Sequence, residues 1–306
     1  MKRNMLYYRP DILLLRFLER FAVAYREKCF KAQEERHIKK WNTMFEDKNF
    51  IILPLDEKTN MHFFQDSDLC KHMYFCAFEE NELSFLKRYL RKGDIFFDIG
   101  ANIGLFSLLA SNVVEDEGEI YAFEPTPETF KRLDANIELN NFTNIKSHQF
   151  AFSNEIGELP FHISTDGSDA FNSFARVKKL ENGDTISVKT ITVDHFIQTE
   201  NIPIADIKLV KIDVEGWEMN VFKGAVDFLS HPDAPALMVE FTDANAIAAG
   251  TSCGKIFDFI KSFGYNWYTY KRKNNKLIFE EKRELYPYMN LIAIKNLDVA
   301  KERLEI

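Results

Sequence analysis

The sequence predicts an α/β fold built on an open, doubly wound sheet that is mostly parallel. Three observations support this: short apolar runs recur from residue 94 onward, helical patterns separate them, and the first run ends in a glycine-bearing turn. The runs do not alternate with polar residues, as is typical of strands that are buried on both faces. We expect strands at residues 95–99, 119–123, 145–152, 207–214 and 237–241.

Helices are expected between these strands, because apolar residues recur there with helical spacing. The helical segments are residues 103–112, 127–140, 217–229 and 253–263. Two further runs, residues 266–280 and 289–295, have no helix between them, which predicts an antiparallel ending to the sheet.

The segment that precedes the first of these strands has its own pattern. Phe50–Leu55 and Met61–Phe64 flank a polar stretch, as in a small hairpin, and two helical patterns follow before Gly93. We therefore expect three parts: a helical extension over residues 1–48, a lead-in over residues 49–93, and the main domain over residues 94–306.

The composition fits a globular chain of ordinary kind. Of 306 residues, 46% are hydrophobic and 28% are charged, which excludes a disordered chain or a collagen-like one. The four cysteines are too few for a disulfide scaffold and too scattered for a zinc site, so we expect reduced thiols and a cytoplasmic location. The net charge of -8 argues against a general nucleic-acid binder.

Residues 1–48 differ from the rest in charge. They hold 12 lysines and arginines against 7 aspartates and glutamates. Charged residues interrupt the apolar ones, so neither a signal peptide nor a membrane span is expected. The helical stripe from Leu14 to Cys29 predicts a basic amphipathic helix that packs on the body or on a second copy of the chain, although contact with a membrane surface is an alternative.

Ligands of open parallel sheets bind beyond the carboxyl ends of the strands. The first strand ends in Asp98, Gly100, Asn102 and Gly104, where the glycines permit a tight turn and a close approach. A purely structural glycine turn is the alternative interpretation. The second strand ends in Glu124, which lies 20 positions after Gly104 and is placed to bind the two hydroxyls of a ribose.

A dinucleotide would require a similar acid, but two features argue against it. Asn102 and Leu105 stand where the G-x-G-x-x-G pattern has glycines. In addition, Asp98, Glu124, Asp213 and Glu215 all fall at strand ends and form a negative region that repels phosphates. A ligand with an amino group, a sulfonium and a ribose suits such a region, and S-adenosylmethionine is that ligand.

Four ordered motifs point to a known family. DIFFDIGANIG (residues 94–104), YAFEPTPE (121–128), FAFSNEIG (150–157) and KLVKIDVEG (208–216) resemble those of the FkbM family of S-adenosylmethionine-dependent methyltransferases. The resemblance extends from about residue 62, through FEENEL, to about residue 241. It implies a class I, Rossmann-like sheet of seven strands in the order 3-2-1-4-5-7-6, and methylation of hydroxyl groups on sugars or small metabolites.

The resemblance also implies roles for single residues. Asp98, Gly100, Asn102 and Gly104 would surround the methionine part of the cofactor. The ribose would lie against Glu124 and Pro125, the adenine beside Phe150 and Ala151, and the reacting end of the cofactor near Asp213.

The strand that carries Lys211 and Asp213 has the strongest chemical signal. Alternation puts Lys211, Asp213 and Glu215 on one side of the strand. A lysine inside a central strand must be paired, either structurally with Asp213, Asp98 or Glu240, or as a residue that tunes carboxylates at the transfer site. Asp213 or Glu215 could orient or deprotonate an acceptor hydroxyl, while Glu215 could instead cap the helix that follows.

Two further sets of residues complete the predicted site. Glu240 and Asp243 lie at the end of the fifth strand and could join Asp213 in binding a divalent metal, but with no histidine at fixed spacing we expect a solvated or salt-bridged acid cluster and no metal. A segment between the third and fourth strands offers Asn172 and Ser173 as substrate contacts, with Glu240 as a third, although a plain surface excursion is the alternative for that segment.

Together these features predict an O-methyltransferase that acts on a sugar, a glycan or a small polar metabolite. The alternatives are an N-methyltransferase for a small amine and a catalytically silent cofactor-binding module. Small-molecule or glycan substrates are the expected partners, nucleic acid is not, and the N-terminal helix could join two copies of the chain.

Overall fold

The computed structural model describes residues 33, 35–76, 78–163, 174 and 184–306. The chain divides into two units, residues 1–51 and 52–306. In the first unit, residues 35–45 are helical, and Trp41 and Phe45 pack together with their ring centroids 4.9 Å apart. The predicted stripe from Leu14 to Cys29 lies outside the described residues.

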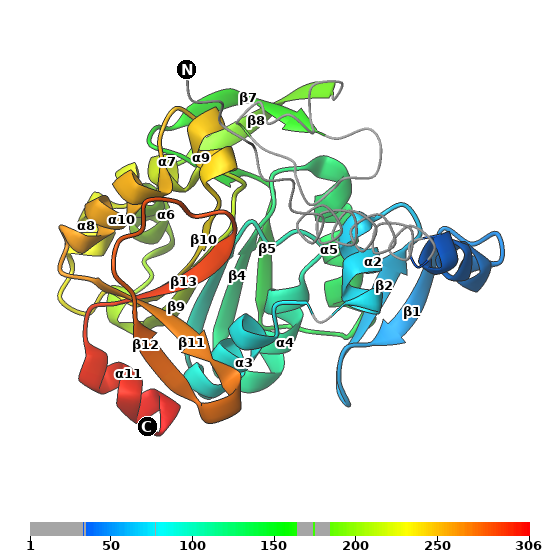
Figure 1. Cartoon of the computed structure of the whole chain (residues 1–306), viewed down its shortest axis with the longest axis horizontal. Helices are drawn as coiled ribbons and strands as arrows, with labels where there is room; N and C mark the ends of the chain where they lie inside the picture. Colours follow the sequence, from blue (N-terminus) through cyan, green and yellow to red (C-terminus); the bar gives the residue numbers. More distant parts are fainter. Residues whose placement is uncertain (1–32, 34, 77, 164–173, 175–183) are drawn as a thin grey trace, which may run out of the picture. The chain divides into compact units, whose positions relative to one another are not determined.

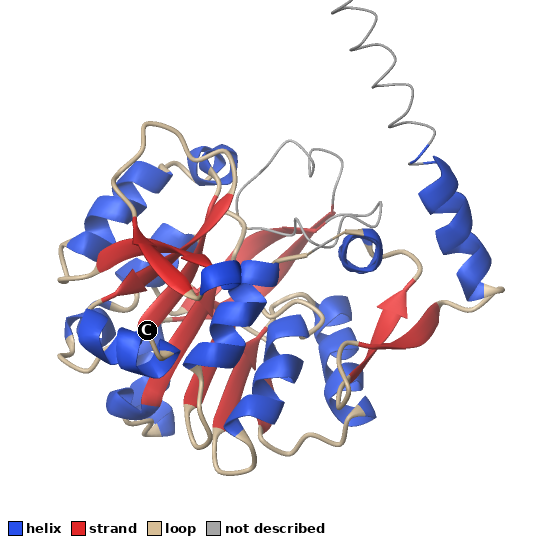
Figure 2. Ribbon diagram, turned by 60° about the horizontal axis from the view of Figure 1, so that its bottom comes forward, coloured by secondary structure: helices blue, strands red, loops and turns tan. Residues whose placement is uncertain are grey.

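The second unit contains an eight-stranded sheet with helices on both faces (Figures 1 and 2). Its strand order is β12-β11-β13-β10-β9-β3-β4-β5. Without β12, this order is the predicted 3-2-1-4-5-7-6, and the pairing of β3 with β4 and β9, of β4 with β5, and of β9 with β10 is parallel as predicted. The strands are β3 (Ile95–Ile99), β4 (Glu119–Phe123), β5 (Ile145–His148), β9 (Ile207–Ile212), β10 (Ala236–Phe241), β11 (Asn266–Lys271), β12 (Lys276–Phe279) and β13 (Met289–Ile294).

The register of the central strands brings their carboxyl ends together. Ile99 is level with Phe123 on β4 and with Ile212 on β9, and Asp98 is level with Lys211. The turns that follow β3, β4 and β9 therefore meet at one edge of the sheet, which is where the sequence predicts the site.

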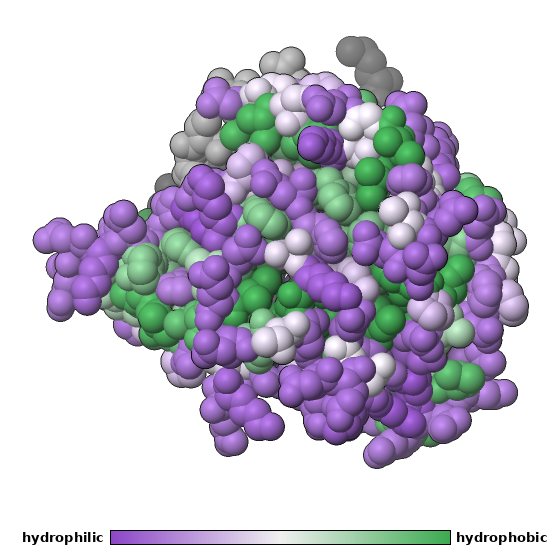
Figure 3. Space-filling model, turned by 180° about the vertical axis from the view of Figure 1, so that it is seen from behind, coloured by the Kyte–Doolittle hydropathy of each residue, from purple (hydrophilic) through white to green (hydrophobic). Residues whose placement is uncertain are grey.

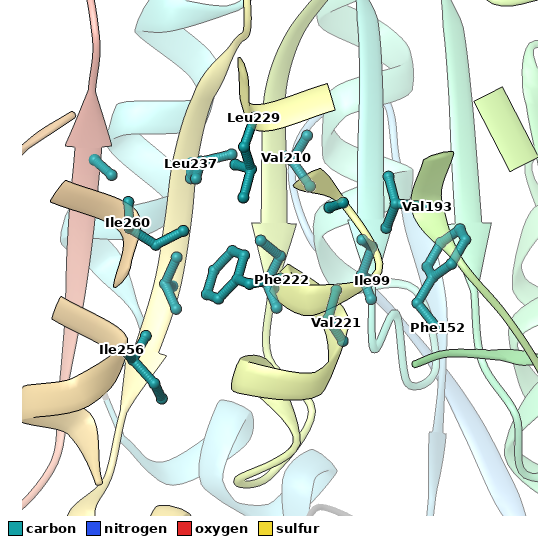
Figure 4. Packing of buried hydrophobic residues seen from close by; sticks show 14 of the residues in the cluster. Ile99, Phe152, Val193, Val210, Val221, Phe222, Leu229, Leu237, Ile256 and Ile260 are labelled. Atoms are coloured by element: carbon teal, nitrogen blue, oxygen red, sulfur yellow. The ribbon is translucent and has the colours of Figure 1, made fainter. Parts of the chain in front are cut away.

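The helices cover the sheet as a doubly wound fold requires. Figure 1 shows α3, α4 and α5 to one side of the sheet and α6, α7, α8 and α10 to the other. Apolar residues of the second group pack on the central strands, as Figure 4 shows for Phe222, Leu229, Ile256 and Ile260. The helices are α3 (Glu80–Tyr89), α4 (Leu105–Val114), α5 (Pro127–Leu139), α6 (Val193–Glu200), α7 (Glu218–Lys223), α8 (Val226–Ser230), α9 (Asp243–Ala248), α10 (Cys253–Lys261) and α11 (Leu297–Leu304).

The predicted strand over residues 145–152 is wrong in one respect. β5 ends at His148, and β6 (Ala151–Phe152) belongs to a separate three-stranded sheet of order β6-β8-β7, with β7 (Gly157–Ile163) and β8 (Asp184–Ile191). Much of the segment between the third and fourth predicted strands is thus β-structure. Both halves contain apolar residues, Ile145 in the first and Ala151 and Phe152 in the second, and their spacing does not show that the two halves join different sheets.

Two other predicted elements are divided in the structure. The run at residues 266–280 forms the antiparallel hairpin of β11 and β12, which adds an eighth strand at the edge of the sheet. The helix predicted over residues 217–229 breaks into α7 and α8 at Gly224. A Cβ on Gly224 would lie 2.1 Å from the carbonyl oxygen of Ser153, so the close contact there requires a glycine.

The predicted lead-in hairpin is confirmed. β1 (Phe50–Pro54) and β2 (Asn60–Phe64) form a two-stranded sheet, and α2 (Asp68–Phe75) and α3 follow it. The side chains of Asn140 and Asn136 on or beside α5 accept hydrogen bonds from the main chain of Asn60 and His62. Strand β2 is thereby fixed to the helix that follows the second strand of the main sheet.

None of the helices in the described part of the chain has the length and apolarity that crossing a bilayer demands. On the face drawn in Figure 3, hydrophilic residues surround smaller hydrophobic groups.

Candidate active site

A cavity of about 790 Å³ lies at the carboxyl edge of the sheet. The ends of β3, β4, β9 and β10 contribute to its walls, as do β6, the start of α3 and the start of β13. Most of the predicted site residues line it, namely Gly100, Asn102, Glu124, Pro125, Phe150, Ala151, Lys211, Asp213, Glu215 and Glu240. The predicted contacts Asn172 and Ser173 lie outside the described residues.

The glycine turn is held against the end of β4. The main-chain N–H groups of Gly100 and Ala101 both donate to the carbonyl oxygen of Phe123, at 3.0 Å. Gly100 and Asn102 both have positive φ angles, of 80° and 50°. Glycine accepts this conformation at no cost, and asparagine is one of the few other residues that adopt it readily.

Two predicted cofactor residues do not line the cavity. Asp98 is fully buried beneath the turn, where it accepts a hydrogen bond from Ser107 at 2.6 Å. Gly104 begins α4, and a Cβ there would lie 2.7 Å from Leu133. Both residues therefore act on the turn from outside the cavity, Asp98 through its buried carboxylate and Gly104 through close packing against Leu133.

Glu124 joins the end of β4 to the glycine turn. One carboxylate oxygen accepts a hydrogen bond from the N–H of Asn102 at 3.2 Å, and the other accepts from the N–H of Thr126 at 2.9 Å. The side chain is buried, yet it borders the cavity. Its carboxylate is thus fixed in position before any ligand binds.

Aromatic rings form the wall beside β6. Phe150 lies between His148 and Phe152, with ring centroids 5.5 and 5.6 Å away. Farther along the wall, Phe174 and Trp217 are in contact, with centroids 5.0 Å apart. The flat face of a heterocyclic ring could stack on these aromatic side chains.

Lys211 is the buried cation of the site. Its ammonium lies 3.0 Å from Asp213 Oδ2 and 3.9 Å from Asp98 Oδ1, and 5.1 Å from the ring centroid of Phe106. Of the structural partners proposed from sequence, Asp213 and Asp98 are therefore found. Burial alone would lower the pKa of this lysine, but the two aspartates and Glu79 reverse that effect and the pKa is raised.

Three carboxylates lie at the ends of β9 and β10. Oxygens of Asp213, Glu215 and Glu240 all lie within 4.8 Å of one another. Asn245 donates to Glu215 at 2.6 Å and Thr242 donates to Glu240 at 3.0 Å. Burial, followed by repulsion from Glu215 and Asp213, raises the pKa of Glu240 well above its ordinary value.

These oxygens are of the type that binds magnesium or calcium, so a divalent cation is chemically compatible with the cluster. Asp243, the other acid that was considered for a metal, is engaged elsewhere. It accepts hydrogen bonds from the main-chain N–H groups of Cys253 and Tyr286 at 3.0 and 2.7 Å. It holds the loop before α10 in place.

Several residues in or near the cavity are absent from the predicted set. Glu218 accepts hydrogen bonds from the N–H groups of Val214 and Gly216, and so holds the turn for which Glu215 had been considered as a cap. Glu79, Tyr288 and Asn290 line the cavity from elements far along the chain from the four motifs. Of these residues, only Glu218 could have been found from a local pattern, because it is an acid in the first turn of a helix.

A comparison with protein-family models matches residues 98–266, more than half of the chain, to the methyltransferase FkbM domain. The chain belongs to the FkbM methyltransferase family. This assignment confirms the predicted family, the class I fold and an S-adenosylmethionine-dependent methyltransferase domain with that cofactor.

Similar proteins of known name include two methyltransferases. The hexuronic acid methyltransferase AglP of Haloferax volcanii is 28% identical over 151 residues, which is 49% of this chain and 58% of the relative. The 31-O-demethyl-FK506 methyltransferase FkbM of Streptomyces tacrolimicus is 31% identical over 163 residues, 45% of this chain and 62% of the relative. The chain thus matches about three fifths of the length of these relatives.

Among solved structures, a precorrin-6y C5,15-methyltransferase from Geobacter metallireducens superposes with a TM-score of 0.40 and 14% sequence identity. The superposition covers 71% of this chain and 88% of that one.

Proposed function

We propose that this protein transfers the methyl group of S-adenosylmethionine to a hydroxyl oxygen of a sugar, a glycan or a small polar metabolite. The observation that carries the proposal is the arrangement of one cavity, with the fixed carboxylate of Glu124 toward β4 and the Lys211–Asp213 pair at the end of β9. The two relatives named above support it, since one is named for a hexuronic acid and the other for a demethylated oxygen of FK506.

The residues present suit the cofactor. The Glu124 carboxylate would accept hydrogen bonds from both ribose hydroxyls, and Phe150 and Ala151 would contact the adenine. Pro125 would support the same region. The turn from Gly100 to Asn102 offers main-chain groups to the methionine part, in a region whose carboxylates favour a cation. When bound, S-adenosylmethionine supplies the electrophilic methyl carbon.

The protein's contribution to the reaction is placement and proton removal. Methyl transfer is an in-line displacement, so holding the acceptor oxygen on the line of the breaking bond supplies much of the acceleration. Asp213, fixed by Lys211 at 3.0 Å, would orient the acceptor hydroxyl and receive its proton, and Glu215 is the second candidate for that role. A general base of this kind contributes roughly 10²- to 10⁴-fold.

An amine acceptor is the second candidate. The cluster of Asp213, Glu215 and Glu240 would attract an ammonium group, which must lose a proton before it can attack the methyl carbon. A catalytically silent cofactor-binding module is the remaining alternative. It requires Glu124 and the glycine turn but does not require the Lys211–Asp213 pair at the same cavity.

Labelled methyl transfer into a pool of hydroxylated glycans tests the proposal. Asp213→Asn should reduce incorporation by at least about 100-fold while binding of S-adenosylhomocysteine, measured by calorimetry, persists. Glu138→Gln, on the exposed face of α5, is the matched control and should match the parent. Incorporation that is unaffected by Asp213→Asn would exclude this residue as the base.

Other expectations stay predictions: the division at residues 48 and 93, a cytoplasmic location, no nucleic-acid partner, pairing of two copies through the N-terminal helix, and a site that works without metal. Activity that survives exhaustive treatment with a chelator would support the last of these.

A further inference from the structure

Glu79 is a cavity residue to which the proposed function assigns no role. It lies within the FEENEL segment and stands at the N-cap position of α3 with φ 44° and ψ 37°. N-cap residues ordinarily have extended backbone and a side chain that binds the first turn, whereas Glu79 is left-handed and makes no such bond. Left-handed backbone is costly for a glutamate, and strain of this kind is concentrated at functional sites.

The side chain of Glu79 is directed to the cavity and contacts the start of β13. Its Oε1 lies 3.5 Å from the hydroxyl of Tyr288 and 3.5 Å from the amide nitrogen of Asn290. Lys211 and Asp213 act on it electrostatically from the end of β9, as does Glu82 from its own helix. Three segments that are distant in sequence therefore meet around one carboxyl group.

The strand order shows which part of the cavity this is. Glu124 and Phe150 follow β4 and β5, on one side of β3, whereas β9, β10 and β13 lie on the other side. If the ribose and adenine occupy the first side, the second side is left for the acceptor. Glu79 lies on that second side, opposite the Lys211–Asp213 pair.

We propose that Glu79 binds the methyl acceptor, hydrogen-bonding a hydroxyl group beside the one that is methylated, and that the acids around it make the site prefer uncharged sugars to uronic acids. This inference rests on the proposed function. Tyr288 and Asn290 line the same wall of the cavity and contact the Glu79 side chain.

The charges around the acceptor side give the preference its physical basis. Asp213, Glu215, Glu240 and Glu82 border it, and the nearby cation Lys211 is already paired with Asp213 and Asp98. Lys271 is the other lysine among the described residues of the wall, so acids outnumber cations there and a sugar carboxylate would enter a region of net negative charge. Burial raises the pKa of Glu79 to about 8, so near neutral pH its carboxyl group can donate a hydrogen bond to a sugar oxygen.

The experiment compares methyl glucoside with methyl glucuronide as acceptors of labelled methyl groups. The parent should have a kcat/KM for the glucoside at least about 10-fold above that for the glucuronide. Glu79→Leu should raise KM for the glucoside roughly 10-fold and change kcat less, whereas Glu79→Gln, which keeps the size and a donor, should stay near the parent. Glu138→Leu on exposed α5 is the control.

The pH profile separates binding from a merely structural role. As pH rises from about 7 to about 9, Glu79 acquires a charge, so the parent's preference for the glucoside should increase, while in Glu79→Gln it should stay constant. If the parent methylates both sugars but Glu79→Leu has an unchanged KM, or if the glucuronide is preferred, this inference fails and the proposed function stands. If the parent methylates neither sugar, the sugar acceptor itself is excluded, and this inference with it.

Discussion

Gly100 and Asp213 approach so closely that a Cβ on Gly100 would lie 1.9 Å from the carbonyl oxygen of Asp213. The N–H of Asp213 also donates to the carbonyl oxygen of Ile99 at 3.1 Å. The turn that would hold the cofactor and the residue that would activate the acceptor therefore share a main-chain contact. Their relative position is set by backbone, and a side chain at position 100 would change it.

Gly100→Ala should destabilise the fold by more than about 2 kcal/mol and abolish binding of S-adenosylhomocysteine, because the methyl group meets backbone that cannot move aside. Gly93→Ala is the matched control, since Gly93 has nearly the same φ, 82° against 80°, but open space around a Cβ. That control should lose about 1 kcal/mol, the cost of the left-handed backbone alone. Urea unfolding measures both variants, and equal losses would contradict the close-contact explanation.

Lys211→Met should destabilise the protein by about 3 to 5 kcal/mol, because it leaves Asp98 buried without its cation. Adding Asp98→Asn to this variant should restore part of the loss by removing the uncompensated charge. Lys282→Met breaks an exposed ion pair with Asp258 and should cost about 1 kcal/mol or less. Thermal and urea unfolding of the four proteins test the prediction, which fails if the double variant is no more stable than Lys211→Met.

Glu124→Gln should weaken binding of S-adenosylhomocysteine by roughly 10-fold or more. The carboxylate accepts hydrogen bonds from Asn102 and Thr126 through its two oxygens, and a glutamine offers a single oxygen for both. Calorimetric titration gives the affinity directly. Glu128→Gln, at the exposed start of α5, changes the same chemical group and should bind as the parent does.

Glu218 should make the stability of the protein depend on pH. Burial raises its pKa to about 7, so the folded state holds this proton more tightly than the unfolded chain does. Its contribution is complete below about pH 4.5 and is lost as pH rises through about 7. Glu218→Gln should remove that dependence, so that its free energy of unfolding falls less than the parent's between about pH 5 and about pH 8. Parallel slopes in urea titrations at these pH values would refute the assignment.

The main sheet was predictable because its strands have clear local limits. The bounds of β3 and β4 agree with the sequence to the residue, since each is a short apolar run that ends where an acid or a turn begins. The prediction of one strand over residues 145–152 failed because the spacing of apolar residues does not show which sheet a strand joins. The hairpin of β11 and β12 was predicted as one run, because the residues of both strands continue the same pattern.

Only those site residues that lie at strand ends were predictable from the sequence. Gly100, Asn102, Glu124, Lys211 and Asp213 meet at the cavity because parallel strands end at a common edge, a rule that sequence order suffices to apply. Glu79 and Tyr288 reach the same cavity through the packing of α3 and of the last strands. Such contacts depend on the tertiary arrangement of the loops, which cannot be deduced from the spacing of residues along the chain.

The small sheet of β6, β8 and β7 has a consequence for how such a protein can diversify. β7 and β8 pair with each other and with β6, and neither pairs with the eight strands that carry Glu124 and Asp213. Insertions, deletions or substitutions between β7 and β8 would therefore leave the register of the main sheet unchanged. Evolution could alter this part of the chain while the strands that carry Glu124 and Asp213, and with them the proposed methyl transfer, are kept.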